Sequence, residues 1–246
     1  MTAVELLYVD GHYAQANPTW HAEDSAWKAE QILRVAAFLP AEHAVRICDI
    51  GCGSGGVLAA LGTTLAQRGI DAQLTGFDIA PLAIQSARAS WGDLTNIDFA
   101  CCNVLHREHL RFDICLLMDV LEHVADPRAF LVGLCDRGLS EFIIHLPLEN
   151  NWLGIMRGRT DPRTSCVGHL HFYDTYSALH LLESSGLHVV QSVYTPEIDL
   201  DLRLHRTLGS IAAYLPRKLL LAIRPRLAVH TLGGAGLMAR CVRAPH

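Results

Sequence analysis

The chain has 246 residues, half of them hydrophobic, and a formal net charge of -5. This length suits a single α/β domain with additions, and the apolar content is enough for a core on both faces of a sheet. The slight acidic excess excludes a chain-wide basic field, so no nucleic-acid partner is expected.

The cysteines and the apolar runs indicate the cellular compartment in which the protein is expected. The eight cysteines show no regular spacing, and several fall within apolar runs that predict strands. Free thiols in a reducing environment explain this pattern better than a disulfide framework. No signal-peptide pattern is present, and no apolar stretch is long enough to cross a bilayer. We therefore expect a cytoplasmic protein without a transmembrane segment.

In chain order, the first expected element is a helix over residues 26–38, with Ser25 as its N-cap and Pro40 ending it. Residues 1–40 are expected to form an N-terminal lid and helix of the same domain, and 41–246 its core. From residue 45 onward, short apolar runs alternate with helical patterns. Strands are expected over 45–50, 74–77, 97–101, 113–118, 142–146, 189–194 and 236–242, and helices over 57–67, 81–89, 127–134 and 175–184.

This alternation, with fully apolar strands, predicts a mostly parallel sheet with helices on both faces. Residues 195–233 interrupt the rhythm, since they are rich in leucine and arginine and contain Pro196, Pro216 and Pro225. We expect a mostly helical insertion there, between the last two strands. Its segment 215–227 alternates arginine with leucine, which fits either peripheral contact with a membrane or packing on the domain with the arginines turned outward.

The most specific pattern is the glycine-rich run from Asp49 to Gly56, between an expected strand and an expected helix. Glycines there allow a tight turn and close approach of a ligand, and the helix N-terminus offers unpaired N–H groups. Gly51, Gly53 and Gly56 also fit the dinucleotide-binding pattern, which alone is a weak signal. Asp49 favours a cationic ligand over a pyrophosphate, and the amino group and sulfonium of S-adenosylmethionine are cationic.

A second acid, Asp78, ends the next expected strand. A carboxylate in this position can accept hydrogen bonds from both ribose hydroxyls of a nucleoside. The alternative is a turn acid that caps the helix expected from Pro81.

These motifs resemble those of class I S-adenosylmethionine-dependent methyltransferases. Residues 49–55 resemble the first motif and residues 76–78 the second, while 112–124 and 168–172 resemble later motifs of the ubiquinone-type O-methyltransferase branch. Residues 17–28 resemble the N-terminal segment of a bacterial subgroup. The resemblance covers nearly the whole chain. It implies a Rossmann-like seven-stranded sheet, mostly parallel, with an antiparallel last strand.

The resemblance also implies the cofactor, S-adenosylmethionine, which would leave as S-adenosylhomocysteine. The loop would hold the methionine part, Asp78 the ribose, and Asn103 with Val104 the adenine. Many relatives carry aspartate where this chain has Asn103, which weakens that one assignment. Trp20 and Trp27 would belong to the lid or only anchor the first helix. The expected cofactor-binding residues are Asp49, Gly51, Cys52, Gly53, Gly55, Asp78, Ile79, Asn103, Val104, Met118, Trp20 and Trp27.

The acceptor side is expected after the fourth strand, because parallel sheets bind ligands at the carboxyl ends of their strands. His123 is the first candidate for a general base, and Glu122 would orient it. The alternative is that both residues only begin the next helix. His145, at the end of the fifth strand, is a second candidate base or a lining residue. Arginines 157, 159 and 163 would bind an anionic group of the acceptor or lie in a solvated loop.

A metal site is an alternative for the same region. Asp119, Glu122 and His123 fall within one expected helical turn, and His169 or His171 could approach them from a later loop. This set resembles the metal site of small-RNA 2′-O-methyltransferases, where a cation activates a hydroxyl. Mixed sets of this kind also arise without a metal, so no metal ion is expected.

The expected function is methyl transfer from S-adenosylmethionine to an oxygen of a small metabolite, a sugar or a lipid-linked acceptor, with nitrogen and carbon acceptors left open. One alternative is a nicotinamide-dependent oxidoreductase, which shares the glycine loop and Asp78 but leaves Asp49 unexplained. The other is a non-catalytic protein that binds the nucleoside without turnover. The acceptor and the oligomeric state are not determined by the sequence.

Overall fold

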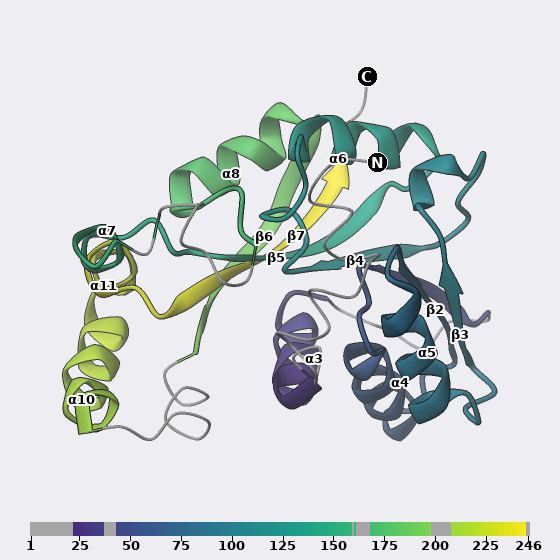
Figure 1. Ribbon diagram of the computed structural model, residues 1–246, viewed down its shortest axis with the longest axis horizontal. Coiled ribbons are helices and arrows are strands. Elements are labelled where there is room, and N and C mark those ends of the chain that lie inside the picture. Colours follow the sequence, from purple (N-terminus) through teal and green to yellow (C-terminus); the bar gives the residue numbers. More distant parts are fainter. Residues whose placement is uncertain (1–21, 37–42, 159, 161–167, 198–207, 245–246) are drawn as a thin grey trace.

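The computed structural model describes residues 22–36, 43–158, 160, 168–197 and 208–244, with the backbone alone for 208–213. Seven strands form one sheet in the order β3-β2-β1-β4-β5-β7-β6 (Figure 1). β7 is antiparallel to β5 and β6, and the other neighbouring pairs are parallel. The predicted Rossmann-like sheet with an antiparallel last strand is confirmed.

The elements follow the predicted alternation closely, with bounds that differ by a few residues. The strands are β1 Val45–Ile50, β2 Ala72–Asp78, β3 Ile97–Cys101, β4 Ile114–Met118, β5 Glu141–Pro147, β6 Leu187–Pro196 and β7 Ala235–Arg243. The α-helices are α3 Ser25–Val35, α4 Gly56–Gln67, α5 Pro81–Trp91, α6 Pro127–Asp136, α7 Trp152–Met156, α8 Thr175–Ser184, α10 Leu208–Ile223 and α11 Pro225–Leu232. Short 3-10 helices cover Ala22–Asp24 (η1) and Val104–His106 (η2). The short helix α7 was not predicted.

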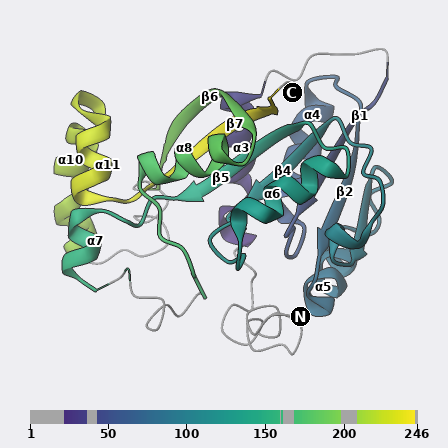
Figure 2. The same cartoon turned by 90° about the horizontal axis from the view of Figure 1, so that it is seen from above.

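Helices cover both faces of the sheet, with α3, α4 and α5 on one face and α6 and α8 on the other (Figures 1 and 2). Ile47 and Leu116 belong to the core on the first face, and Cys48 and Cys115 to the core on the second. Because both faces are covered, the central strand β4 is buried at every position. This double burial explains the continuous apolar runs in the sequence.

The N-terminal helix differs from the prediction at both ends. Asp24 occupies the N-cap position of α3, so Ser25 is the first helical residue and not the cap. The helix ends at Val35, earlier than expected. It packs against α4 and also reaches β6 and β7. Trp20 and the rest of the expected lid before residue 22 lie outside the described residues.

Two helices, α10 and α11, stand where the helical insertion was expected, although β6 continues to Pro196. Pro225 occupies the first turn of α11, where its missing N–H is tolerated, whereas Pro216 lies inside α10. Together with α7, these helices lie at the opposite end of the molecule from α4 and α5 (Figures 1 and 2). Within the described part of the chain, no helix has both the length and the apolar character needed to span a bilayer.

Candidate active site

A cavity of about 590 Å³ lies at the carboxyl ends of β1, β2 and β4. Its volume is typical of small-molecule sites. The strand order reverses between β1 and β4, and the crevice at such a reversal is where open α/β sheets bind ligands. The expected site residues that line this cavity are Asp49, Gly51, Cys52, Gly53, Asp78, Ile79, Asn103, Val104, Met118, Asp119, Glu122, His123 and His169.

The glycine loop is fixed to the neighbouring strand by its backbone. Gly51 N donates to the carbonyl oxygen of Phe77 (2.7 Å), and Gly53 N donates to Oδ2 of Asp78 (2.9 Å). Gly51 has φ +77°, and a Cβ there would lie 2.7 Å from a methyl group of Val120. Both the left-handed backbone and the close contact require glycine, so the loop stays open towards the cavity.

Gly55 has a different role from the one expected. It is not part of the cavity lining. Its φ is +79°, and a Cβ there would lie 2.5 Å from the ring of Phe99 in β3. The indole of Trp91 also donates to the carbonyl oxygen of Ser54 (3.0 Å). Gly55 therefore lets the loop pack on β3, and the expectation of direct cofactor contact is corrected.

Asp49 is a buried carboxylate with one oxygen that has no hydrogen-bond partner. It is 1% exposed, and its Oδ1 has no hydrogen-bond partner. Burial raises its pKa to about 7, and nearby Asp78 adds to the rise while Lys28 opposes it. A cationic group bound beside Asp49 would stabilise the ionised form. The carboxylate therefore suits the positive ligand that the sequence predicted.

Asp78 anchors the loop with both carboxylate oxygens. Oδ2 accepts from Gly53 N (2.9 Å), and Oδ1 accepts from Ala80 N (2.8 Å). Burial raises the pKa of Asp78, and these backbone hydrogen bonds oppose the rise. The bond to Ala80 matches the turn-acid alternative, but the bond to Gly53 ties the acid to the cavity. A carboxylate oxygen accepts more than one hydrogen bond, so ribose hydroxyls could bind as well.

The expected adenine side is largely apolar. Val104 and Met118 are buried and line the cavity. Asn103 also lines it, and its Oδ1 accepts from Leu105 N (3.0 Å), which begins the 3-10 helix η2. A carbonyl oxygen has two lone pairs, so this bond leaves one acceptor position on Asn103 for a ligand.

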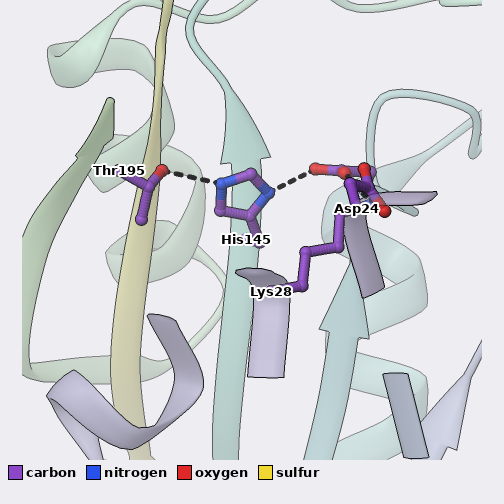
Figure 3. Close-up of polar contacts among 5 residues, drawn as sticks. Asp24, Lys28, His145 and Thr195 are labelled. Carbon is purple, nitrogen blue, oxygen red and sulfur yellow. Dashed lines mark hydrogen bonds and ion pairs between the residues drawn. The ribbon is translucent and has the colours of Figure 1, made fainter. Parts of the chain in front are cut away.

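Lys28 brings a buried positive charge from α3 into the cavity lining, and the sequence analysis missed it. Its Nζ lies 2.8 Å from Oδ2 of Asp119 and 3.0 Å from Oδ2 of Asp24 (Figure 3). Burial would lower its pKa, but these two carboxylates raise it above the usual value. The sequence signal that could have identified Lys28 is its position on the helix, because it shares the buried face of α3 with Ala29 and Ile32.

His145 does not face the cavity, so the expectation that it lies at the pocket mouth as a base is wrong. It is 1% exposed, with Nδ1 2.5 Å from Oδ1 of Asp119 and Nε2 2.8 Å from Oγ1 of Thr195 (Figure 3). Burial would lower its pKa, but Asp119 raises it. Both ring nitrogens are therefore engaged in a structural network. The ring of Trp27 packs edge-on against His145, outside the cavity lining, which fits the anchoring alternative for Trp27.

Asp119 belongs to this network and not to a helix. It has φ +56°, and a turn follows it up to the start of α6 at Pro127. The predicted helical turn over residues 119–123 is therefore wrong. Burial would raise the pKa of Asp119, but His145 and Lys28 lower it below the usual value, so it stays ionised. Its carboxylate is occupied by these two partners.

The acceptor half of the cavity holds Glu122, His123 and His169. Glu122 is fully buried, neither carboxylate oxygen has a hydrogen-bond partner, and burial together with Asp119 raises its pKa well above the usual value. His123 Nδ1 lies 3.3 Å from the carbonyl oxygen of Gly168. Gly168, and not Glu122, thus orients His123, which corrects the expected role of Glu122.

Part of the chain is similar to a known domain family. The model of the methyltransferase domain family matches residues 48–136, which is less than half of the chain. This segment resembles a methyltransferase domain. The matched residues include the glycine loop, Asp78 and the segment after β4, so the resemblance expected from the sequence is confirmed.

The chain is also similar to curated proteins over part of its length. It is 35% identical over 91 residues to the ubiquinone biosynthesis O-methyltransferase of Neisseria meningitidis serogroup C (strain 053442). That match covers 35% of this chain and 36% of the relative. The chain thus spans about a third of the length of the curated relatives that it matches first.

Structural similarity extends further. A chain of the complex that contains the Haloferax volcanii Trm112 methyltransferase activator matches with a TM-score of 0.66 and 17% identity, over 96% of both chains. Magnesium protoporphyrin IX methyltransferase from Synechocystis PCC 6803, solved with bound S-adenosylhomocysteine, has a TM-score of 0.56 and 16% identity, over 94% of this chain and 86% of that one. At these identities the likeness concerns the fold alone.

The cavity brings part of the expected metal set together. One ligand atom each from Glu122, His123 and His169 lies within 4.8 Å of the others. His169 Nδ1 lies 2.6 Å from Oε2 of Glu149, and a carboxylate behind a histidine is common at metal centres. Asp119 is held by Lys28 and His145 instead. The three clustered side chains could hold a divalent cation.

The remaining predicted residues lie elsewhere. His171 Nε2 lies 2.9 Å from the carbonyl oxygen of Val124, so this histidine is turned away from the three clustered side chains. Arg157 is exposed and is not part of the cavity lining. Arg159 and Arg163 lie outside the described residues.

Proposed function

We propose that this chain transfers a methyl group from S-adenosylmethionine to an oxygen of a small metabolite, a sugar or a lipid-linked acceptor. The observation that carries the proposal is a pair of acids, the buried Asp49 and the half-buried Asp78, which flank the glycine loop in one cavity of a chain with a methyltransferase-domain match. The cofactor supplies an electrophilic methyl group. The protein supplies binding, orientation and a dry site.

The cofactor half of the cavity fits this ligand by charge. Asp49 would take the ammonium group beside the sulfonium, because its ionised form needs a cation. Lys28 lines the same cavity and would complement the carboxylate of the methionine part. Asp78 would accept from the ribose, with Asn103 and Val104 beside the adenine.

On the acceptor side, His123 is the proposed base. A carbonyl oxygen can only accept, so Nδ1 of His123 donates to Gly168 and Nε2 carries the lone pair of the neutral ring. Nε2 could then take the proton of an acceptor hydroxyl as the methyl group arrives. Burial raises the pKa of Glu122 and so favours its neutral form, which would offer a hydrogen-bond donor to an acceptor oxygen. These two groups favour an oxygen acceptor.

The two alternatives have less support. The family match and the structural neighbours favour methyl transfer and give no support to a nicotinamide-dependent oxidoreductase. A non-catalytic binding protein would keep the same cofactor half, so only turnover separates it from an enzyme. The cytoplasmic location stays part of the proposal, supported by the free state of all cysteines in the described residues.

Calorimetric titration with S-adenosylhomocysteine and with NAD tests the cofactor. We expect binding of the former only, and Asp78→Asn should weaken it roughly 10- to 100-fold by removing a charged acceptor. Asp98→Asn, an exposed acid on β3, is the matched control and should bind normally. Binding of NAD, or no binding of S-adenosylhomocysteine, would contradict the proposal.

Transfer of a labelled methyl group to fractions of a cell extract tests the reaction. His123→Ala should abolish transfer while leaving S-adenosylhomocysteine binding within about threefold, because its ring is placed on the acceptor side. If the cofactor binds but no fraction is labelled by the unaltered protein, the non-catalytic alternative gains.

A further inference from the structure

The helices at the end of the molecule opposite α4 and α5 expose apolar side chains instead of burying them. On α10, Leu215, Leu219 and Ile223 recur every fourth residue, with exposed fractions of 72%, 63% and 63%. This spacing places them along one face of the helix. Leu227 on α11 continues the exposed set. A helix on a water-facing surface normally carries polar residues on that face.

A second exposed apolar group lies next to this face. Trp152, Ile155 and Met156 of α7 are exposed by 68%, 53% and 69%. α7 packs against α11, and all three helices lie together in both views (Figures 1 and 2). Contiguous apolar surface of this kind marks a contact site. We call the exposed side chains of α7, α10 and α11 the apolar end face.

The charged side chains of α10 and α11 have one sign. The sequence after Asp201 contains eight arginines and lysines and no aspartate or glutamate. Three of these cations lie on α10 and α11 and a fourth, Arg224, lies between the two helices; Arg224 and Arg226 are exposed at this junction. The chain as a whole has a net charge of -5, so this end differs from the rest. Apolar side chains edged by cations complement an anionic lipid surface.

The apolar end face is also connected to the acceptor side of the cavity. Glu149 lines the cavity, and two residues later Asn151 caps α7 by accepting from Gly154 N (2.8 Å). The buried amide of Asn151 packs on Gly233, where a Cβ would lie only 2.4 Å from its Nδ2. Gly233 follows α11 directly. The loop that borders the cavity therefore also holds α7 against α11.

We propose that the apolar end face docks the protein on an anionic lipid membrane. The leucines, Ile223 and the α7 side chains enter the boundary of the headgroups and acyl chains, and the cations contact lipid phosphates. A symmetric dimer through the same face is disfavoured, because it would bring the arginines of both copies together without a carboxylate on either helix. The proposal goes beyond the proposed function and does not depend on it.

Co-sedimentation of the full chain with vesicles tests this inference. We expect binding to vesicles of equal parts phosphatidylglycerol and phosphatidylcholine, and at least tenfold weaker binding to phosphatidylcholine alone. Leu219→Asp and the double variant Arg224→Glu with Arg226→Glu should each weaken binding to the anionic vesicles at least tenfold. Each cation at an anionic surface contributes about 1 kcal/mol, or roughly fivefold. High salt should release the protein.

The controls are matched in chemistry and lie at the other end of the molecule. Leu82→Asp on α5 and Arg68→Glu after α4 alter exposed residues of the same types and should leave vesicle binding unchanged. Binding of S-adenosylhomocysteine by every variant checks that the cavity is intact.

The inference is overturned if the unaltered protein does not bind anionic vesicles at low salt, or if the end-face variants bind these vesicles as well as the control variants do. It is also overturned if light scattering shows a dimer that the end-face variants dissociate, because the face would then join two copies of the chain. Failure of S-adenosylhomocysteine to bind the unaltered protein would contradict the proposed function and leave the vesicle result standing.

Discussion

The cofactor half of the cavity and the side-chain network around Asp119 are built in different ways. In the cofactor half, backbone N–H groups join the loop after β1 to the acid at the end of β2, as from Gly53 to Asp78. In the network, side chains from distant segments hold one another, as Asp119 holds Lys28 and His145. Backbone anchoring makes the cofactor half depend on local sequence. The network depends on how α3, β5 and β6 are packed.

This difference distinguishes a carboxylate that is available to a ligand from one whose charge is paired within the fold. Asp49 has an oxygen without a partner, and its raised pKa reflects a cost that a ligand could remove. Asp119 has two partners and a lowered pKa, so its charge is already satisfied within the protein. We therefore expect substitutions in the Asp119 network to affect mainly stability, and substitutions around Asp49 to affect mainly binding.

The largest expected effect is that of Lys28→Met, which breaks the network around Asp119. Removing the ammonium group leaves the carboxylates of Asp24 and Asp119 without their common partner, and breaking a buried ion pair costs about 3–5 kcal/mol. Chemical denaturation measures the loss. Glu30→Gln, at an exposed position of the same helix, should change stability by less than about 0.5 kcal/mol. Equal stability of the two variants would show that the network does not hold the fold.

The next effect compares two glycines with similar backbones. Gly55 and Gly69 have φ of +79° and +70°, so alanine strains both by about 1 kcal/mol. A Cβ at Gly55 would also strike the ring of Phe99, whereas nothing lies within 4 Å of one at Gly69. Overpacking adds about 1–3 kcal/mol, so Gly55→Ala should be the less stable variant by that amount in thermal unfolding. Similar losses would mean that Gly55 is not packed as described.

The third effect is a pH dependence of cofactor binding. In the free protein the pKa of Asp49 is raised to about 7, and a bound cation would lower it by favouring the ionised carboxylate. Binding below pH 7 must therefore release a proton. The dissociation constant of S-adenosylhomocysteine should rise roughly tenfold per pH unit as the pH falls below 7, and stay nearly flat above it.

Calorimetry in buffers of different ionisation enthalpy measures the released proton. Asp49→Asn should bind weakly with a flat profile, whereas Asp98→Asn, an exposed position on β3, should keep the profile of the unaltered protein. A profile that stays flat in the unaltered protein would remove Asp49 from the ligand contacts.

The smallest effect concerns Glu122 and decides the metal question. Burial raises the pKa of Glu122 well above the usual value, which favours the neutral carboxyl group, and glutamine is its neutral isostere. Without a metal, Glu122→Gln should change stability by less than about 0.5 kcal/mol. If a cation occupies the cluster with His123 and His169, elemental analysis will detect it, and the variant will lose both metal and stability. Chelation of the unaltered protein should then lower its melting temperature.

The cofactor half could be predicted because its signals are local. Asp49 and the glycines are adjacent in sequence, and the strand before them and the helix after them fix their geometry. Asp78 was predicted at a strand end and lies there. His145 was assigned to the pocket from the same reasoning, but the side chain belongs to the layer between the sheet and α3, next to Trp27. A strand end gives the position of a residue and not the direction of its side chain.

The sequence by itself determined the alternation of strands and helices, the glycine loop and the two acids around it, because hydrophobic period and glycine requirements act over a few residues. The tertiary structure decided which titratable groups meet. Lys28, Asp119, His145 and Thr195 come from four separate segments, and only the packing of α3 on the sheet brings them together. Such distant partners decide whether a buried charged group is paired within the protein or is available to a ligand. No local sequence pattern encodes them.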